Sequence, residues 1–89
     1  MELTVTIEKI LDVQSIKKKD GSAITKYGFV GKTQGRYAKL VKFDVFNQER
    51  FNAFNLEVGK TFAVSFEAES KEWKGSWFTT LVAWKAVRV

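Results

Sequence analysis

Residues 69–84 have the sequence ESKEWKGSWFTTLVAW and contain all 3 tryptophans of the chain. This pattern predicts the end of one strand, a loop over residues 70–76 and a final strand after the loop. Trp73 lies between Lys71 and Lys74, where we expect the chain to turn through solvent. A large ring at such a place buries little against a core, but its face can stack on a flat, negatively charged ligand.

Apolar and polar side chains alternate in the segments before this hairpin. The period of two predicts strands over residues 2–13, 24–33, 37–46 and 61–69. In the first of them the alternation slips at residues 9–11, where a bulge or a sharp coil would let one long strand serve both sides of a barrel. The side chains expected to face the core are Leu3, Val5, Ile7, Tyr27, Phe29, Val41, Phe43, Val45, Phe62, Val64, Phe66 and Ala68.

Residues 48–56 have a different period, because Phe51 and Phe54 are three apart and suit one face of a short helix. Asn47 is a suitable N-cap for this helix. We expect the helix to close one end of a barrel with its two rings. Phe46 precedes the cap, so its ring either packs on Phe51 as a hydrophobic staple or stacks on a ligand, and the sequence leaves both roles open.

The predicted order is three strands, a short helix and two more strands, in a single domain over residues 1–89. Five antiparallel strands with a helix between the third and the fourth are typical of an all-β, five-stranded OB-fold barrel. The strand pattern alone also fits a small SH3-like barrel, but the position of the helix favours the OB fold. A ligand would then cross strands two and three between the loops at residues 15–23 and 70–76. Gly28 would leave that surface flat.

The composition excludes several kinds of site. The chain has 0 cysteines and 0 histidines, which excludes disulfides, Cys/His zinc sites, thiol nucleophiles and histidine bases, and we expect no cofactor and no metal. Asp44 is the only acid on the predicted ligand face of the strands, and Gly28 and Gly31 lack the further glycine and helix of a phosphate-binding loop. We therefore expect a binding protein that is not an enzyme.

The beginning of the chain and its hydropathy bear on its location. Residues 1–4 show no basic region followed by an apolar run, so no signal peptide is expected. No apolar run approaches transmembrane length. We therefore expect a cytoplasmic protein that does not enter a membrane.

The net charge of +5 is distributed unevenly along the chain. Residues 9–42 contain nine basic side chains and two acidic ones, whereas residues 43–89 contain six of each sign. Such a basic stripe favours a polyanion as partner, although a soluble basic face without a partner explains the charge equally well. The run Lys17–Lys19 has two interpretations, as solvated charges that protect a hairpin tip or as phosphate contacts, and the first is slightly favoured.

Binding of single-stranded nucleic acid needs cations for the backbone and ring faces for the bases. The candidate cations are Lys17, Lys18, Lys19, Lys26, Lys32, Lys39, Lys42, Lys71 and Lys74. The candidate rings are Tyr37, Phe46, Trp73, Trp77 and Trp84. Three of these rings have structural alternatives: core packing is favoured for Trp77, rim packing or a subunit interface is an equal choice for Trp84, and Tyr37 can close the adjacent turn.

The segment Lys71–Ala83 resembles the last hairpin of bacterial single-stranded DNA-binding proteins (SSBs), in which a Lys/Arg-Trp pair precedes a polar loop and an aromatic-Thr-Thr strand. Val41–Phe46 resembles the third strand of those proteins. Nearly the whole chain is similar to a family of short bacterial and phage SSB-like OB-fold proteins, mostly uncharacterised. That similarity rests on the Met-Glu-Leu-Thr start, the turn at Thr33–Tyr37 and the pair Ala83-Trp84.

The resemblance implies stacking positions at Trp73 and Phe46, a backbone contact at Lys42, and a homodimer or higher homo-oligomer. Two departures limit what it implies. The acidic, Phe-terminated tail through which SSBs recruit other proteins is not expected here, and Leu40 stands where SSBs often have Trp. The first departure weakens the case for partner recruitment, and the second implies a lower affinity.

Sequence and resemblance together predict binding of single-stranded DNA, or of RNA, with little sequence specificity, by a basic groove and aromatic stacking. One alternative is a protein-interaction module that uses the same barrel and its exposed rings. A protein interface should depend on salt much less than a polyanion does. Another alternative is an oligosaccharide-binding OB module, which should tolerate Lys→Glu changes in the Lys17–Lys19 run.

Overall fold

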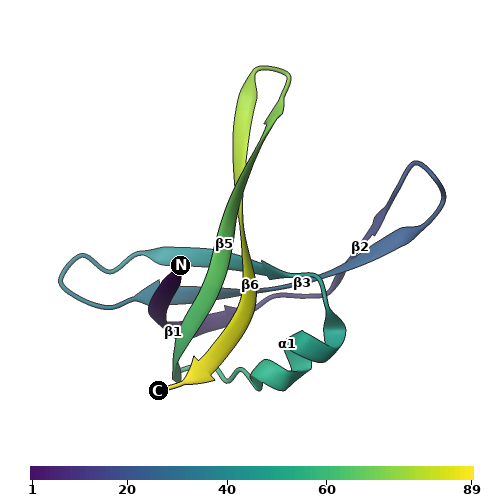
Figure 1. Cartoon of the computed structure of the whole chain (residues 1–89). Helices are drawn as coiled ribbons and strands as arrows, with labels where there is room; N and C mark the ends of the chain where they lie inside the picture. Colours follow the sequence, from purple (N-terminus) through teal and green to yellow (C-terminus); the bar gives the residue numbers. More distant parts are fainter.

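Six strands and one short helix make up the chain, and the computed structural model describes all of its residues, Met1–Val89. The elements in order are β1 (Glu2–Ile10), β2 (Gln14–Lys17), β3 (Ala23–Thr33), β4 (Leu40–Val45), α1 (Gln48–Phe54), β5 (Thr61–Trp73) and β6 (Ser76–Arg88). The sheet order is β1-β5-β6-β4-β3-β2, and a further pairing of β1 with β3 joins its ends. Five strands therefore close on themselves, as the predicted OB-fold barrel requires (Figure 1).

Two features of the strand pairing differ from the expectation. The pairing of β4 with β6 is parallel, through Asp44 and Val82, so the sheet is not wholly antiparallel. The first predicted strand is divided in two, because β1 ends at Ile10 and β2 begins at Gln14, and both pieces pair with β3. A bulge is present between Ile7 and Lys9, just before the predicted residues 9–11, and it lets β1 pair with β5 in its first half and with β3 in its second.

The core lies inside the barrel and is built from the inward side chains of five strands and from Phe54 of α1. Phe29 stacks on Phe43 with 5.1 Å between ring centroids, and Phe66 meets Phe43 edge-on at 5.3 Å. The buried apolar residues are Val5, Ile7, Tyr27, Phe29, Phe43, Val45, Phe54, Phe62, Val64, Phe66 and Ala83. The predicted core is confirmed for most positions. It is wrong for Ala68, which is exposed because β5 has left the barrel there, and Ser65 is buried although the alternation placed it outside.

The helix α1 has the predicted cap and covers one end of the barrel. The Oδ1 atom of Asn47 accepts a hydrogen bond from the backbone N–H of Arg50 at 2.9 Å. Phe54 is buried in the core, and Phe51 stacks on Tyr27 with 5.1 Å between ring centroids. Asn55 then takes a left-handed conformation (φ 51°), which ends the helix at Phe54, two residues earlier than expected. No helix in this chain has the length and apolar character needed to cross a membrane.

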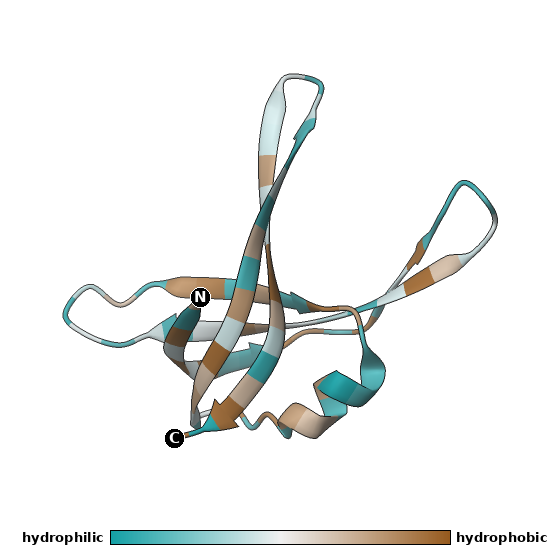
Figure 2. Ribbon diagram, viewed as in Figure 1, coloured by the Kyte–Doolittle hydropathy of each residue, from teal (hydrophilic) through white to brown (hydrophobic).

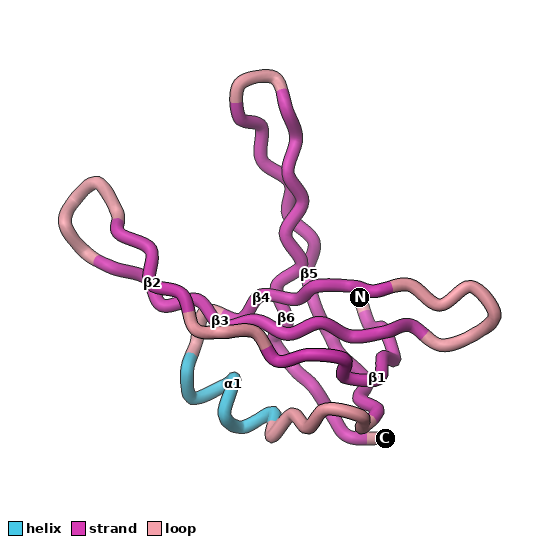
Figure 3. Tube along the Cα trace, turned by 180° about the vertical axis from the view of Figure 1, so that it is seen from behind, coloured by secondary structure: helices cyan, strands magenta, loops and turns pink.

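Three hairpins project beyond the barrel: in Figure 1 the β5–β6 hairpin points up, the β2–β3 hairpin points to the upper right and the β3–β4 hairpin points to the left, and Figure 3 shows them from behind. We name residues 14–26, at the β2–β3 end, the lysine arm, and residues 68–81, at the β5–β6 end, the tryptophan arm. In Figure 2 most of the apolar segments lie in the barrel, a few lie on the two arms, and the turns at the arm tips are largely hydrophilic. Both predicted loops are shorter than expected, because the strands of each arm continue to pair in solvent: the loop at 15–23 reduces to residues 18–22, and the loop at 70–76 reduces to a two-residue turn.

The two-residue turn is Lys74-Gly75, and both residues have positive φ, 49° and 82°. That conformation has the twist of a type I′ turn, which matches the right-handed twist of the two strands it joins. Pairing therefore continues to the last pair before the turn, Trp73 with Ser76. The sequence signal for such a turn is usually Asn-Gly or Asp-Gly, which is why Lys-Gly did not reveal it.

Candidate nucleic-acid interface

The outer face of β3 and β4 carries the predicted groove. Register pairs Gly28 with Asp44 and Val30 with Lys42, so these side chains and Lys26 share the surface that points away from the core. The assignment of strand faces from the sequence is thus confirmed. The face lies at the base of the two arms, and we call it the groove face.

A buried carboxylate organises the centre of the groove face. The side chain of Asp44 is only 8% exposed, and it makes ion pairs of 3.6 Å with Lys26 and 3.5 Å with Lys42. Its Oδ1 atom accepts no hydrogen bond. A cavity of about 20 Å³ adjoins it, with Leu11 and Asp12 among the lining residues, and that volume is close to what one water molecule needs. The two lysines are therefore held on the groove face, and part of their charge is offset there.

Gly28 does not provide the flat, open patch that we expected, because it is buried. A Cβ atom at this position would lie 3.2 Å from Leu11 Cδ1 and 3.2 Å from the carbonyl oxygen of Phe43. The break between β1 and β2 brings Leu11 over the strand, where its backbone N–H donates to the carbonyl oxygen of Gly28 at 3.0 Å. Glycine suits this close approach of Leu11, and the prediction that Gly28 leaves the sheet surface flat and open is wrong.

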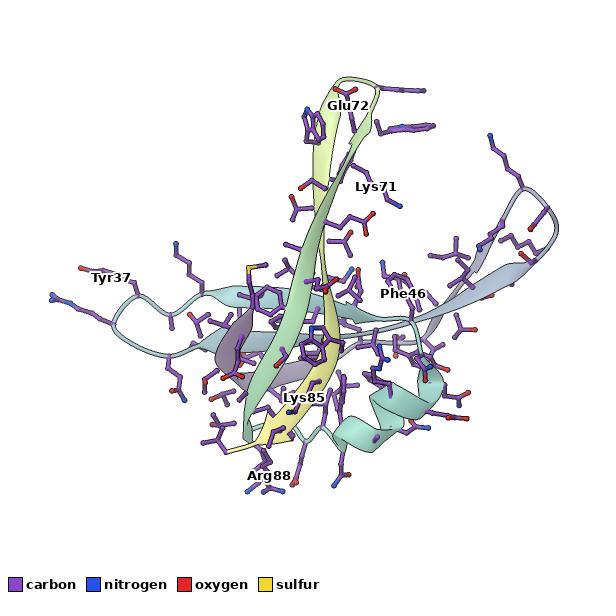
Figure 4. The ribbon with its side chains drawn as sticks, viewed as in Figure 1. Tyr37, Phe46, Lys71, Glu72, Lys85 and Arg88 are labelled. Carbon is purple, nitrogen blue, oxygen red and sulfur yellow. The ribbon has the colours of Figure 1, made fainter.

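A larger hollow of about 220 Å³ lies where the tryptophan arm leaves the barrel. Figure 4 shows Phe46 at the base of the space between the arms and Lys71 pointing from the tryptophan arm toward that space. The residues that line the hollow are Phe46, Glu69, Lys71, Phe78, Thr80 and Val82. The structure thus brings two of the predicted site residues together with four that sequence analysis did not select. The alternation of β6 did place Phe78, Thr80 and Val82 on one side, and that was the available signal.

Trp73 and Trp77 lie at the end of the tryptophan arm on opposite faces. Trp73 shares a face with Lys71 and is 66% exposed, and Lys74 Nζ lies 5.5 Å from its ring centroid. Trp77 is 68% exposed, so the expectation of core packing is wrong. Trp77 lies on the same face of the hairpin as Leu81, which is partly buried. Trp77 is nearer the turn, however, where the arm has already extended beyond the barrel.

The remaining predicted residues do not gather at one place. Tyr37 is exposed at the tip of the loop between β3 and β4, on the opposite side of the barrel from the lysine arm, and Arg36 lies 5.6 Å from its ring (Figure 4). Trp84 is exposed at the bulge of β6 where the register shifts. The other predicted cations are all exposed: Lys17, Lys18 and Lys19 on the lysine arm, Lys32 and Lys39 near the β3–β4 loop, and Lys74 at the tip of the tryptophan arm.

The turn of the lysine arm is fixed by Asp20. Its Oδ1 atom accepts hydrogen bonds from the hydroxyl of Ser22 at 2.6 Å and from the backbone N–H of Ser22 at 2.9 Å. These two bonds, the hydroxyl bond first, lower the pKa of the Asp20 carboxyl below its ordinary value. The carboxylate therefore stabilises the turn that presents Lys18 and Lys19.

Known structures with a similar fold include two proteins that bind single-stranded DNA. The mitochondrial single-stranded DNA binding protein Rim1 from S. cerevisiae superposes with a TM-score of 0.69 at 13% identity, over 100% of this chain and 95% of that one. The small single-stranded DNA-binding protein from Streptomyces coelicolor superposes with a TM-score of 0.52 at 10% identity, over 100% of this chain and 92% of that one. At these identities the comparison confirms the SSB-like OB fold.

Sequence comparison identifies the family. No functionally curated protein matches the chain. Residues 2–87 match the family described as a domain of unknown function (DUF3127), and the chain therefore belongs to that family.

Proposed function

We propose that this protein binds single-stranded DNA, or RNA, in the groove between its lysine and tryptophan arms, with little sequence specificity. The observation that carries the proposal is the convergence of Lys26, Lys42, Phe46, Lys71 and Trp73 on the groove face and on the adjacent face of the tryptophan arm. Cations along a groove and exposed ring faces beside it are the two elements that single-strand binding needs. The likeness to two structures named for single-stranded DNA binding supports the proposal.

The roles that we propose for the rings and the lysines follow from their burial and charge. Bases stack on Trp73 and on Phe46, while lysines of both arms neutralise phosphates. Asp44 and Glu69 each pair with lysine, and the proposal involves no enzymatic step. Asp44 offsets part of the charge of Lys26 and Lys42, so the exposed lysines of the two arms should make most of the phosphate contacts.

The first experiment compares two tryptophans that differ in their face. Trp73→Ala should weaken binding of a mixed-sequence single strand of about 16 nucleotides by roughly 5- to 150-fold, because one stacked base contributes about 1–3 kcal/mol. Trp77→Ala is the matched control, since Trp77 is equally exposed but faces away from the groove. Affinity is measured by fluorescence anisotropy of the labelled strand, and quenching of intrinsic fluorescence should be lost only with Trp73. Equal losses in the two variants would contradict the groove.

Salt provides an independent part of the same experiment. If about five lysines neutralise phosphates, the logarithm of the affinity should fall with the logarithm of salt concentration at a slope near −3.5, from about −0.7 per contact. A fourfold rise in salt would then weaken binding about a hundredfold. A slope near zero would argue against a polyanion ligand.

A second candidate function is protein interaction, which includes self-association into a homodimer or higher homo-oligomer. The exposure of Trp77 and Trp84 outside the groove favours it. Binding that is shallow in salt and unaffected by Trp73→Ala would favour this function over the first.

A further inference from the structure

Asp44 lies at the point of the groove face where three strands meet. The strand register places it opposite Gly28 of β3 and opposite Val82 of β6, and the second pair is the one at which β4 joins β6. Its Oδ1 atom and Leu11 Cδ1 both lie over Gly28, 3.6 Å and 3.2 Å from the place where a Cβ atom would be. Strands on both sides therefore fix this carboxylate at the centre of the groove face.

The partners of the carboxylate are two lysines. Oδ2 lies 3.6 Å from Lys26 Nζ and Oδ1 lies 3.5 Å from Lys42 Nζ, both longer than the roughly 2.7–2.9 Å of a charge-assisted hydrogen bond. Oδ1 is buried and accepts no hydrogen bond. A buried acceptor without a hydrogen bond costs free energy of folding, so stability alone explains Asp44 poorly.

Burial makes these two ion pairs different from the third one near the groove. The side chain of Asp44 is 8% exposed and that of Lys26 is 21% exposed. In the pair of Glu69 with Lys71, at 3.7 Å, the side chains are 61% and 79% exposed, so water and salt screen their attraction. The effective dielectric constant is lower around Asp44, and its attraction for lysine is correspondingly stronger.

A phosphate that enters the groove meets this attraction as a competitor. Lys42 is 53% exposed, so a strand can reach its ammonium group. That charge is already offset by a carboxylate that is held in place, and the same carboxylate repels the incoming phosphate. A lysine in this state contributes less to binding than the exposed lysines Lys17–Lys19, which form no ion pair.

We propose that Asp44 is an internal competitor of phosphate for Lys26 and Lys42, an autoinhibitory contact that keeps the affinity of the groove for single strands below what its lysines could provide. The inference rests on the proposed function, since the phosphates belong to a strand in the groove. It assigns Asp44 a role in setting affinity and salt dependence, in addition to its place in the sheet.

The test removes the charge of Asp44 and keeps its size. Asp44→Asn should bind a mixed-sequence single strand of about 16 nucleotides about tenfold more tightly at low salt. The logarithm of the affinity should also fall more steeply with the logarithm of salt concentration, by up to about 1.4, because two released lysines each add about 0.7 to the slope. Fluorescence anisotropy of the labelled strand measures both quantities.

Asp12→Asn is the matched control. Asp12 lines the small cavity beside Asp44, but it is exposed and forms no ion pair with lysine. Its replacement removes the same charge from the same region, and so measures the gain that follows from net charge alone. We expect a gain below about twofold and a change of slope well below the 0.7 of one contact.

A second substitution shows whether the gain passes through the released lysines. Added to Asp44→Asn, Lys42→Gln should take back about 0.7 of the steeper slope, since one phosphate contact is lost again. Lys39→Gln in the same background is the control. Lys39 is exposed near the β3–β4 loop and does not pair with Asp44, so its replacement should take back less.

The fold of the variants is checked by their thermal midpoints. Asparagine has nearly the size of aspartate, and the flexible stems of Lys26 and Lys42 let their ammonium groups reach water once the carboxylate is gone. The asparagine amide N–H₂ would face two ammonium groups, so Asp44→Ser, which lacks that group, serves the same test if Asp44→Asn does not fold.

The outcomes separate the inference from the proposed function. Wild-type binding with no gain in a folded Asp44 variant, or with an equal gain in Asp12→Asn, overturns the competitor role, while binding in the groove stands. A steeper slope that survives the added Lys42→Gln change also overturns it. Failure of the wild-type chain and of the Asp44 variant alike to bind at low salt overturns the proposed function itself.

Discussion

The lower and upper halves of the β5–β6 hairpin follow the same alternation of side chains, with opposite results. In the lower half, Phe62, Val64 and Phe66 point into the barrel and are buried. In the upper half, Trp73 and Trp77 occupy the two faces of the hairpin and are both about two-thirds exposed. Alternation therefore tells which side chains share a face. Whether that face is covered depends on how far the strands extend beyond the barrel.

Because of this difference, side chains in the lower half of the hairpin contribute to stability, whereas rings in the upper half are available for binding. A side chain in the lower half is fixed by its neighbours, and its contacts already contribute to folding. A ring in the upper half has no such contacts, so its face remains available to a ligand. The long arm thus places large apolar side chains in solvent, where a monomeric protein ordinarily keeps few of them together.

The largest expected effect is on the folding of the barrel. Phe43→Ala removes a fully buried ring that packs on both Phe29 and Phe66, and it should lower the free energy of unfolding by about 3–5 kcal/mol. Trp77→Ala removes a larger ring, but this ring lies on the exposed arm. The substitution should change the free energy of unfolding by less than about 0.5 kcal/mol. Urea unfolding followed by far-UV circular dichroism measures both.

Comparable losses of unfolding free energy in Phe43→Ala and Trp77→Ala would contradict the distinction between the packed barrel and the exposed arm. They would mean that the arm packs against something in solution, such as a second copy of the chain. A dependence of the Trp77→Ala effect on protein concentration would then identify self-association.

Two glycines offer a smaller and more local comparison. Gly31 lies where β3 crosses β1, and a Cβ there would lie 2.7 Å from Val5 Cβ, so Gly31→Ala should cost about 1–3 kcal/mol through overpacking. Gly75 has open space around it but a φ of 82°, and alanine there costs about 1–2 kcal/mol in the turn alone. The Gly31 variant should lower the thermal midpoint by about 4 °C or more, since each 1 kcal/mol shifts it by about 4–8 °C.

The Gly75 variant should leave that midpoint nearly unchanged. Fraying of the arm tip absorbs the strain, so the loss should appear as faster hydrogen exchange of amides in the tryptophan arm. Gly75→Asn is the control, because asparagine tolerates the left-handed conformation better than alanine. A midpoint that falls equally for both alanine variants would show that the arm unfolds together with the barrel.

Local signals in the sequence predicted most of the fold. The spacing of Phe51 and Phe54 after Asn47 identified the capped helix, because capping and helical period involve only near neighbours. The slip near Ile10 identified the bulge region for the same reason. The length of the arms was not predictable, since it depends on strand pairing that continues in solvent and on a Lys74-Gly75 turn without the usual signal.

The candidate site was predicted less completely because it is built by distant contacts. Phe46 and Phe78 come together only through the parallel pairing of β4 with β6, which no local pattern indicates. Leu11 covers Gly28 only because the regular strand is interrupted between β1 and β2. The ion pair of Asp44 with Lys26 likewise joins β4 to β3. The alternation of side chains correctly predicted which residues of β3 and β4 face outward. Which residues of other elements lie beside them depends on the tertiary pairing of the strands.

The smallest expected effect concerns the turn of the lysine arm and is confined to it. Ser22→Ala removes the hydroxyl that donates to Asp20, so the pKa of the Asp20 carboxyl should rise toward its ordinary value, although the backbone N–H bond remains. A lowered pKa means that the turn is stabilised above the ordinary pKa and loses that stabilisation as pH falls through the lowered value. NMR titration of the carboxyl carbon measures the shift, and Ser15→Ala in the same arm is the control. Because Asp20 is fully exposed, the unfolding midpoint of the barrel should stay constant in both variants. An unchanged Asp20 pKa in Ser22→Ala would mean that water, and not the serine hydroxyl, solvates this carboxylate.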